Sequence, residues 1–494
     1  MENNVNDKVV PVSLKNFSIN LGDRVMLKSC DLQLEKSSST VIMGPTGTGK
    51  SVFLKSIAGI LSTKLFSFGG TMDINGITGY KDGKKSNFNT WTEIEQSGIM
   101  FVPAETAMVM NPSLTLEQNM NLLAPGCNDV IVERLKTYFT MDFTKFARLY
   151  PDELSGGEMQ RITLMILLSR KGNLILLDEP TVNLDRNLRK NFVEFLNNEI
   201  LNDNSKTFLM VSHDLDFIKR LTVQQVFRLE EGIINKLEVL PEMEGYEKPE
   251  AKKGASGTAI ELTDVAQVYM KRGIFGERKF EAFRGLNLKF ERSTIYGITG
   301  PSGCGKSSMI KAILRLMDGT TGKIELEGQD LVALKVKENG HDPKVFKPFR
   351  KRMTVVQQDS RFSFFPDLTI RNSFKQIAKE GNGETVEELL ENMKKVGMTE
   401  ANLDERPNQL SSGEMKRMDI ARALTAKPDI LLLDEPFAHI DFDTRLQVMK
   451  AISDYLAEHA TILVIVTHED FDLRYFVEQS YDFPTLVGQW AEEK

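Results

Sequence analysis

The chain contains the octapeptide Gly44-Pro45-Thr46-Gly47-Thr48-Gly49-Lys50-Ser51 and repeats the pattern at Gly300-Pro301-Ser302-Gly303-Cys304-Gly305-Lys306-Ser307. Each octapeptide follows a short apolar run, at 41–43 or 295–298, and precedes a segment with helical periodicity. A phosphate-binding P-loop requires this order of strand, glycine-rich loop and helix start, because unobstructed backbone N–H groups can then point at phosphate oxygens. The two loops therefore predict two nucleotide-binding sites.

The side chains of the loops predict how phosphates and a metal ion are held. The lysine of each loop reaches the outer phosphates, and the serine after it offers a hydroxyl to Mg²⁺. Cys304 lies at the start of a predicted helix, so we expect the helix dipole to lower the pKa of its thiol. The predicted nucleotide-binding residues of the loops are Thr46, Gly47, Thr48, Gly49, Lys50, Ser51, Ser302, Gly303, Cys304, Gly305, Lys306, Ser307 and Ser308.

Length and composition exclude several classes of protein. The 494 residues are too many for one compact core, and 41% hydrophobic and 27% charged residues are ordinary for a globular protein. A net charge of −7 argues against a nucleic-acid-binding face, so no direct nucleic-acid partner is expected. No apolar run approaches the ~18 residues of a membrane helix, and the N-terminus has no signal-peptide core, so we predict a cytoplasmic protein. The three cysteines have neither disulfide-framework nor zinc-site spacing.

Four motifs recur at nearly one offset, which indicates a duplicated domain. The offset is 256 positions for three pairs and 255 for the last, in Lys50 and Lys306, Ser155 and Ser411, Asp178 and Asp434, and His213 and His468. We predict a first domain at 1–241, a flexible linker at 242–258 and a second domain at 259–494.

Each copy predicts an α/β fold. Continuous apolar runs such as 174–177 and 461–466 are typical of strands buried on both faces of a mostly parallel, doubly wound sheet. Alternating segments that end at turn glycines, 72–76 and 324–328, predict a small antiparallel β subdomain. Segments 113–170 and 368–425 predict a helical subdomain.

Two further motifs follow each loop. One is Ser155-Gly156-Gly157-Glu158 or Ser411-Ser412-Gly413-Glu414 before a helical pattern, and the other is Asp178-Glu179-Pro180 or Asp434-Glu435-Pro436 after an apolar run. A carboxylate at a buried strand end can hold Mg²⁺, and the next carboxylate can orient or deprotonate a water. With these motifs in order, twice, and a histidine after the following strand, the chain resembles the ABC ATPase family over nearly its whole length.

The resemblance implies two ABC-type P-loop NTPase domains that bind ATP and Mg²⁺ and hydrolyse ATP. The implied catalytic residues are Glu179, His213, Glu435 and His468, and the implied metal-site residues are Ser51, Asp178, Ser307, Gln358 and Asp434. The implied signature contacts to nucleotide are Ser155, Gly157, Glu158, Ser411, Gly413 and Glu414, and Tyr269 is expected to stack on adenine. In this family the signature of one domain completes the site of the other, so the resemblance also implies intramolecular pairing of the two domains.

The sequence departs from the family pattern at four positions. Leu21 occupies the adenine-stacking position of copy one, and Ala104 stands where glutamine is expected. In copy two Ser412 replaces a signature glycine, and His439 stands where a small residue is common. In a head-to-tail pair all four fall on the site built on the first P-loop. We therefore predict that the second P-loop's site carries most hydrolysis, while the first retains ATP or hydrolyses it slowly.

Copy two, at 269–276 and around Gln358, resembles ATPase subunits of di/oligopeptide- and nickel-type importers. Segments 114–119 and 368–372 resemble regions near the groove where a membrane subunit docks. The aromatic cluster Phe362, Phe364, Phe365 and Pro366 either lines that groove or fills a core. The first hypothesis is thus the energising subunit of an importer, bound to separate membrane-spanning subunits at the inner face of the cell membrane.

The alternative is an ABC ATPase that acts on a cytosolic macromolecular complex. Ribosome-acting ABC factors resemble the chain poorly, because they carry a long charged helical linker. The two-domain ABC component that energises activation of methyl-coenzyme M reductase fits the architecture better, although no motif selects it. The resemblance leaves both a membrane partner and a soluble enzyme or ribosomal partner open.

Overall fold

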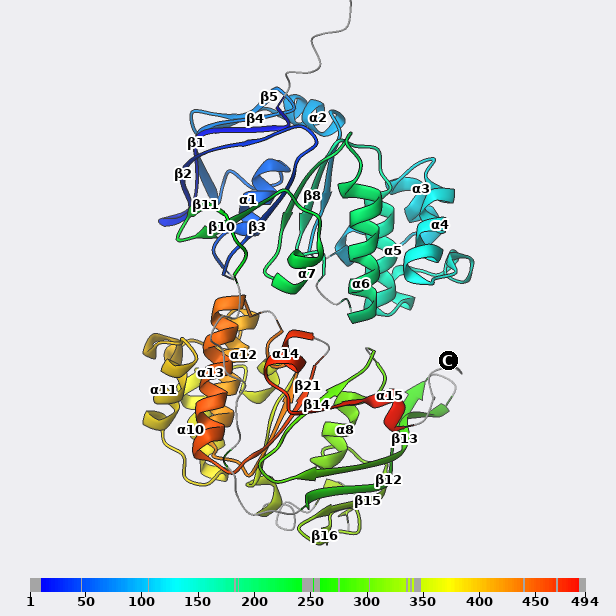
Figure 1. Cartoon of the computed structure of the whole chain (residues 1–494), viewed down its shortest axis with the longest axis vertical. Helices are drawn as coiled ribbons and strands as arrows, with labels where there is room; N and C mark the ends of the chain where they lie inside the picture. The colour runs from blue at the N-terminus through cyan, green and yellow to red at the C-terminus, as the bar shows by residue number, and fades with distance from the viewer. Residues whose placement is uncertain are drawn as a thin grey trace, which may run out of the picture. The chain divides into compact units, whose positions relative to one another are not determined.

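The structure, a computed structural model, describes residues 10–45, 47–104, 106–181, 184, 186–241, 252, 258–273, 276–301, 303–334, 336–337, 340–341, 348–438, 440–467 and 470–487. The chain divides into two compact units, Met1–Glu242 and Met243–Lys494 (Figure 1). Of the predicted linker, only Lys252 and Thr258 are among the described residues.

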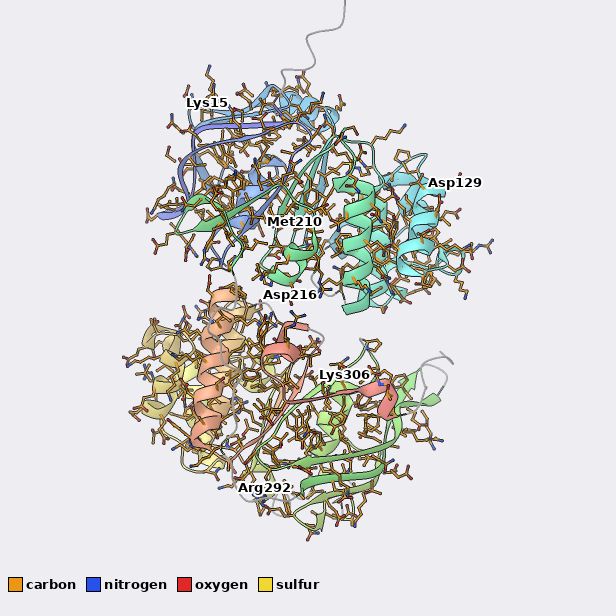
Figure 2. All side chains as sticks on the ribbon, viewed as in Figure 1. Lys15, Asp129, Met210, Asp216, Arg292 and Lys306 are labelled. Carbon is orange, nitrogen blue, oxygen red and sulfur yellow. The ribbon has the colours of Figure 1, made fainter. Side chains whose placement is uncertain are left out.

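A mostly parallel sheet forms the centre of the first unit. Its strands are β3 (Ser39–Met43), β7 (Ile99–Val102), β8 (Leu174–Asp178), β9 (Thr207–Val211), β10 (Gln225–Glu230) and β11 (Ile233–Leu237). The strand order is β11-β10-β3-β9-β8-β7, and all neighbours are parallel except β11, which runs antiparallel to β10. Every residue of β3, β8 and β9 is buried, as their continuous apolar runs predict. Met210 of β9 lies in this core, whereas Lys15 and Asp129 are exposed (Figure 2).

The N-terminal strands of the first unit form an antiparallel sheet. It has the order β2-β1-β4-β5-β6, in strands β1 (Val12–Leu21), β2 (Arg24–Leu34), β4 (Phe66–Ile74), β5 (Ile77–Lys81) and β6 (Lys84–Lys85). Asn75 and Gly76, with φ of 48° and 78°, make the tight turn between β4 and β5. Two successive positive φ values match the twist of an antiparallel hairpin. The predicted antiparallel subdomain is therefore present.

Helices of the first unit pack on the parallel sheet and extend to one side of it. They are α1 (Lys50–Ile57), α2 (Phe88–Gln96), α3 (Leu116–Leu123), α4 (Asn128–Phe139), α5 (Gly156–Leu168), α6 (Arg186–Phe195) and α7 (Leu215–Arg220). Phe53, Leu54 and Ile57 of α1 join the same core cluster as Ile42 and Leu176 of the sheet. Helices α3, α4 and α5 lie within the predicted helical segment 113–170, and α6, green in Figure 1, packs beside them.

The second unit repeats this architecture. Its parallel sheet has the order β19-β20-β21-β14-β22, in strands β14 (Ile295–Thr299), β19 (Met353–Val356), β20 (Ile430–Asp434), β21 (Ile462–Val466) and β22 (Gln479–Asp482). The antiparallel strands are β12 (Thr258–Gly273), β13 (Gly276–Glu291), β15 (Thr320–Leu326) and β16 (Gln329–Asp330), with a separate pair β17 (Val336–Lys337) and β18 (Gly340–His341). The helices are α8 (Lys306–Ile313), α10 (Ile370–Glu380), α11 (Val386–Lys395), α12 (Ser412–Thr425), α13 (Phe442–Glu458), α14 (Asp470–Tyr475) and α15 (Phe483–Leu486).

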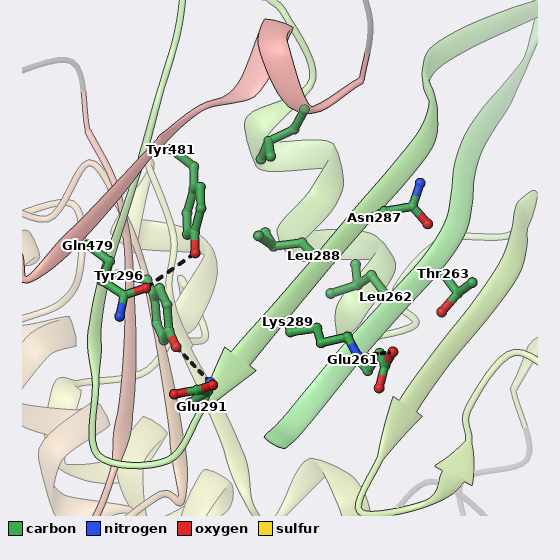
Figure 3. Close-up of a pocket in the computed structure, with 11 residues that line it drawn as sticks. Glu261, Leu262, Thr263, Asn287, Leu288, Lys289, Glu291, Tyr296, Gln479 and Tyr481 are labelled. Atoms are coloured by element: carbon green, nitrogen blue, oxygen red, sulfur yellow. Dashed lines mark hydrogen bonds and ion pairs between the residues drawn. The ribbon is translucent and has the colours of Figure 1, made fainter. Parts of the chain in front are cut away.

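The units differ at one sheet edge. In the first unit β11 pairs with β10 and forms the edge of the sheet. Within the described residues of the second unit, β22 is the edge strand on the corresponding side. A groove of about 500 Å³ lies between this strand and β13, where Tyr296 and Tyr481 stack with ring centroids 6.2 Å apart (Figure 3). Its lining includes none of the predicted nucleotide-binding or catalytic residues. The groove is therefore separate from the P-loop.

Candidate active site

Each P-loop folds around its own lysine. In the first unit Lys50 Nζ donates to the carbonyl oxygens of Gly44 and Pro45, both at 2.8 Å. In the second unit Lys306 Nζ donates to Gly300 O at 2.8 Å and Pro301 O at 2.7 Å. Each ammonium is thus held at the mouth of a loop between a buried strand and a helix start. This arrangement places a fixed positive charge and helix N-terminal N–H groups where phosphate oxygens would bind.

The loops pass too close to a neighbouring strand for most side chains. Gly49 and Gly305 precede the two helices with φ of 98° and 109°, a region that favours glycine. A Cβ at Gly49 would lie 3.0 Å from Met26 O, and one at Gly305 would lie 2.9 Å from Ala282 O. The last loop glycine is therefore required both by its backbone angle and by the space available.

A serine and an aspartate meet at the foot of each loop. Ser51 Oγ donates to Asp178 Oδ1 at 2.7 Å, and Ser307 makes the corresponding side-chain hydrogen bond to Asp434. Both aspartates are buried, and burial raises the pKa of each carboxyl above its ordinary value despite the serine hydrogen bond. Each pair is a small set of hard oxygen donors in a place where a cation would offset the cost of a buried carboxylate. These donors fit Mg²⁺, which is commonly held by one or two carboxylates together with substrate phosphates.

The next carboxylate in the first unit pairs with the predicted histidine. Glu179 Oε2 lies 2.9 Å from His213 Nδ1, and the His213 backbone N–H also donates to Oε2 at 3.3 Å. Burial alone would raise the pKa of Glu179, but His213 and its hydrogen bonds hold that pKa below its ordinary value. Burial would lower the pKa of His213, and the Glu179 charge holds it above its ordinary value. The structure thus joins two residues that are 34 positions apart into an ion pair that could orient a water.

In the second unit the corresponding carboxylate contacts an amide. Gln358 Nε2 donates to Glu435 Oε2 at 3.2 Å. Gln358 follows β19 and Glu435 follows β20, so adjacent parallel strands bring the two side chains to the same edge of the sheet. The arrangement links the predicted metal-site glutamine directly to the predicted water-orienting carboxylate.

Both predicted catalytic glutamates have an unusual backbone. Glu179 and Glu435 have φ of 46° and 49°, which few residues other than glycine adopt. Their N–H groups donate to Val211 O at 3.0 Å and to Val466 O at 2.8 Å, on the neighbouring strand. The surrounding sheet therefore holds a strained turn at the same position in both units, as is typical of functional sites.

Comparison with known proteins gives this geometry a family. The pattern described as "ABC transporter" matches residues 27–182 and 283–438. The chain belongs to the ABC transporter family. Its units are tandem ABC ATP-binding domains, and the predicted α/β fold and ATP hydrolase activity are confirmed.

Relatives in this family include named transport ATPases. The chain is 25% identical over 465 residues to the peptidoglycan transport ATP-binding protein YejF of Agrobacterium fabrum, which covers 87% of this chain and 82% of the relative. It is 31% identical over 222 residues to the oligopeptide transport ATP-binding protein AppF of Bacillus subtilis, over 43% of this chain and 65% of the relative.

Solved structures show the same ABC fold. An RNase-L inhibitor structure superposes with a TM-score of 0.62 at 21% identity, covering 94% of this chain and 86% of the other. Archaeal ribosome recycling factor aABCE1, in complex with ribosomal stalk protein aP1, gives a TM-score of 0.62 at 20% identity, with 95% and 86% covered. At this identity the likeness is one of fold.

No helix among the described residues is long and apolar enough to cross a membrane.

The ABC signature forms a helix cap in both domains. Ser155 Oγ donates to Glu158 Oε2 at 2.6 Å, and Glu158 N donates back to Ser155 Oγ at 3.4 Å at the start of α5. Ser411 and Glu414 repeat this capping box at the start of α12, at 2.6 and 3.3 Å. A Cβ added at Gly156 or Gly157 would meet no atom within 4 Å. Packing inside the first domain therefore does not require these two glycines.

Strand register identifies the ABC departures of the first domain. Ile99 pairs with Leu174 in β7, and Met353 pairs with Ile430 in β19, so the residue two places after each strand is Ala104 in one domain and Gln358 in the other. The methyl group of Ala104 cannot donate the hydrogen bond that Gln358 makes to Glu435, the predicted catalytic carboxylate.

The same comparison applies to the predicted adenine-stacking position. Leu14 pairs with Met72, and Leu262 pairs with Ile324, which places Leu21 at the position of Tyr269. Phe17, the nearest aromatic residue, is fully buried in the core.

The sequence alone does not identify two residues that contact predicted nucleotide-binding residues. Phe280 lies opposite Tyr269 on β13, and the two rings stack with centroids 6.5 Å apart. Arg24 donates to Gly47 O at 3.0 Å in the first P-loop. Either residue could have been found only from the hairpin register, which sequence motifs do not specify.

The predicted lowering of the pKa of the Cys304 thiol is wrong. Burial raises the pKa of its thiol above the ordinary value and outweighs the nearby Lys306 charge, although Lys306 Nζ lies 3.7 Å from Sγ. The sulfur turns toward Gly300 and packs against the core of the second domain. Its position at a helix start is as predicted, but desolvation decides its protonation.

The remaining predicted residues divide into two groups. Thr48 bonds to Pro45 O at 2.9 Å inside its loop, and Ser308 lies on α8 directly after Ser307. Four predicted residues lie outside the described part of the chain, namely Thr46, Ser302, His439 and His468.

Proposed function

We propose that this ABC ATPase is the energising subunit of an importer and binds separate membrane-spanning subunits at the inner face of the cell membrane. The transport names of its relatives support this role. The observation that carries it is an exposed apolar loop beside Gln358, the predicted metal-site glutamine of the second domain, with a counterpart in the first.

The loop after Gln358 presents aromatic side chains to solvent. Phe362 is 76% exposed and Phe365 is 46% exposed, whereas Phe364 is buried and belongs to the core. In the first domain Met108 is 80% exposed, and it lies four residues after Ala104 as Phe362 lies four residues after Gln358. A single exposed apolar residue is ordinary, but the two exposed phenylalanines of this loop, with Met108 exposed at the matching position of the first domain, support the proposal of a docking surface.

The loop is anchored rather than free. Ser363 Oγ donates to Asp419 Oδ2 of α12 at 2.9 Å, and Phe365 N donates to Ser373 Oγ of α10 at 2.8 Å. Both acceptor residues are fully buried. A membrane subunit that contacted Phe362 would therefore push on a segment that also carries Gln358, and through Gln358 on Glu435. This connection provides a physical route from docking to hydrolysis.

We also infer that each site works with Mg²⁺. The buried Asp178 and Asp434, each hydrogen-bonded to a P-loop serine, support this cofactor. EDTA should abolish ATP hydrolysis, and added Mg²⁺ should restore it. Calorimetry should show that Asp178→Ala and Asp434→Ala together weaken binding of Mg²⁺-ATP more than binding of ATP in EDTA.

Site-specific photocrosslinking in the native cells tests the docking proposal. A photoreactive phenylalanine analogue replaces Phe362, and in a matched control it replaces Phe88, which is 84% exposed on α2 of the first domain. We expect crosslinks from position 362, and not from position 88, to integral membrane proteins that copurify with the chain.

Crosslinks from position 362 to soluble enzymes or ribosomal proteins would instead support the alternative role on a cytosolic complex, such as the methyl-coenzyme M reductase system. Equal crosslinking from both positions would show that the exposed loop has no specific partner.

A further inference from the structure

Lys416 is a buried lysine on the signature helix α12 with an unusual set of partners. It is 2% exposed, and its Nζ donates to Gln357 O at 2.7 Å and Gln358 O at 2.8 Å. The same nitrogen lies 3.5 Å from Asp434 O at the end of β20. Within the described part of the chain, its hydrogen-bond acceptors are main-chain carbonyls of the glutamine loop and of the strand that carries the catalytic pair. One ammonium thus joins three functional segments of the second domain.

The hydrogen bonds of Lys416 constrain the glutamine loop. Hydrogen bonds from one donor to the carbonyl oxygens of Gln357 and Gln358 fix the orientation of the two peptide units on either side of Gln358. From that backbone the Gln358 side chain reaches Glu435 at 3.2 Å. A small rotation of either peptide unit would move the Gln358 side-chain amide away from Glu435. Displacements of about 1 Å can lower catalytic rates strongly. The lysine is therefore placed to decide whether the amide stays on the carboxylate.

Other polar residues of α12 secure the same segment. Asp419 and Arg422 follow Lys416 at helical spacing and lie on the same face of the helix. Asp419 accepts from Ser363 Oγ at 2.9 Å, and Arg422 donates to Val355 O at 2.7 Å. The helix therefore holds the stretch from β19 to the exposed aromatic loop at both ends, with Lys416 at the middle.

The first domain differs at this helix face. Gln160 occupies the position of Lys416, is also buried, and donates to Pro180 O at 3.4 Å. Thr163 and Ile166 stand where α12 has Asp419 and Arg422. The first domain also has Ala104 in place of Gln358. The charged helix face and the glutamine that it secures thus occur together in the second domain.

We propose that Lys416 is a positioning residue for ATP hydrolysis in the second domain, where it fixes the backbone of Gln357 and Gln358 so that the Gln358 amide remains on Glu435. Burial of an ammonium group is unfavourable unless every proton has an acceptor. An apolar side chain would fill the same space, so the three carbonyl contacts give the lysine a role that packing alone does not.

A double-mutant cycle on the full chain tests this role. Lys416→Met removes the donor with little change in length, and Gln358→Ala removes the amide that the donor is proposed to position. Phosphate release gives kcat and KM for ATP, and thermal unfolding gives the melting temperature of each variant. We expect Lys416→Met to lower kcat about fivefold with KM within about twofold of the wild type, and to lower it less than about twofold in the Gln358→Ala background.

The control is Gln160→Met, which makes the same replacement at the matched position of the first domain. It should lower kcat less than about twofold, because no glutamine stands at position 104 to be positioned. If Lys416→Met unfolds at a much lower temperature, Lys416→Gln goes through the same cycle, since the first domain already accommodates glutamine there. The proposal is overturned if the lysine variant loses the same factor with and without Gln358, if it keeps more than about half of kcat, or if Gln160→Met loses as much.

Discussion

Replacing each predicted catalytic glutamate in turn tests the predicted inequality of the two sites. The structural basis is a single hydrogen bond, since Gln358 donates to Glu435 at 3.2 Å while Ala104 has no side-chain donor for Glu179. A hydrogen bond to a charged group contributes about 1.5–3 kcal/mol. Because Gln358 is exposed, we take the low end of this range for its hydrogen bond to Glu435. A difference of about 1.4 kcal/mol in activation free energy corresponds to about a tenfold difference in rate.

The expected turnover follows from this factor. If the second site is about tenfold faster, it carries about nine-tenths of steady-state hydrolysis. Glu435→Gln should then leave about a tenth of the wild-type rate of phosphate release under saturating Mg²⁺-ATP, and Glu179→Gln should leave about nine-tenths. A larger loss from Glu179→Gln would refute the reasoning. Equal losses would leave it without support, because tightly coupled equal sites behave in the same way.

Two further variants separate these outcomes. Gln358→Ala should bring the two sites close to equal rates, so that the two glutamate substitutions then cause similar losses. Gly156→Ser copies the Ser412 departure into the consensus signature, and its Cβ meets no atom within 4 Å in its own domain. Its melting temperature should therefore match the wild type. A lower ATPase rate at unchanged stability would place its effect outside that domain, as the family's shared sites imply.

Three smaller perturbations test the loops, the thiol and the histidine pair. Lys50→Ala with Lys306→Ala should reduce phosphate release below about a tenth of wild type, because each lysine is a fixed charge on the phosphates; a higher rate would contradict the assignment of the loops. Because burial raises the pKa of Cys304, iodoacetamide at pH 7 should inhibit slowly and inhibition should quicken as pH rises; rapid inhibition at pH 7 that Cys304→Ser abolishes would show a thiolate instead. The ion pair lowers the pKa of Glu179 below its ordinary 4.5 and raises the pKa of His213 above its ordinary 6.5. The stabilisation that this pair gives to the folded state is therefore complete between pH 4.5 and pH 6.5. It is lost in stronger acid, and it is also lost as pH rises through the raised pKa of His213. His213→Ala should therefore lower the free energy of unfolding by about 3 kcal/mol near pH 6 and by less at pH 9; a difference that grows with pH would be inconsistent with the ion pair.

Motif residues were predictable because their chemistry requires both a residue type and a spacing. A phosphate loop needs glycines before a lysine, and a strand end such as Asp178-Glu179 needs its carboxylates adjacent in sequence. The mostly parallel sheets are predicted by continuous apolar runs, and both hairpins are predicted by a turn glycine, whereas the strand order is not predicted. These features depend on short segments, so one sequence is enough to recognise them.

The other contacts depend on segments that no local pattern connects. In the sequence alone Lys416 is indistinguishable from an ordinary helix lysine, and its role depends on contact with the loop after β19. Phe280 contacts Tyr269 only because of the register of a long hairpin. The predicted pKa of Cys304 is wrong for a related reason. Its position at a helix start can be recognised from neighbouring residues, whereas the burial that raises its pKa comes from residues far along the chain. Competing effects on one group can be weighed only after packing is known.

The capping boxes of the two signatures affect how signature mutants should be interpreted. Ser155 and Ser411 each close the first turn of a long helix through the glutamate three residues later. Replacing an N-cap serine with alanine costs about 0.5–2 kcal/mol, whereas glycine costs only a few tenths. A serine-to-alanine change therefore frays a helix as well as removing a hydroxyl, and lost activity in such a mutant combines a folding defect with a catalytic one. Ser155→Gly and Ser411→Gly are the cleaner genetic tools, because they remove the hydroxyl while leaving the helix start nearly intact.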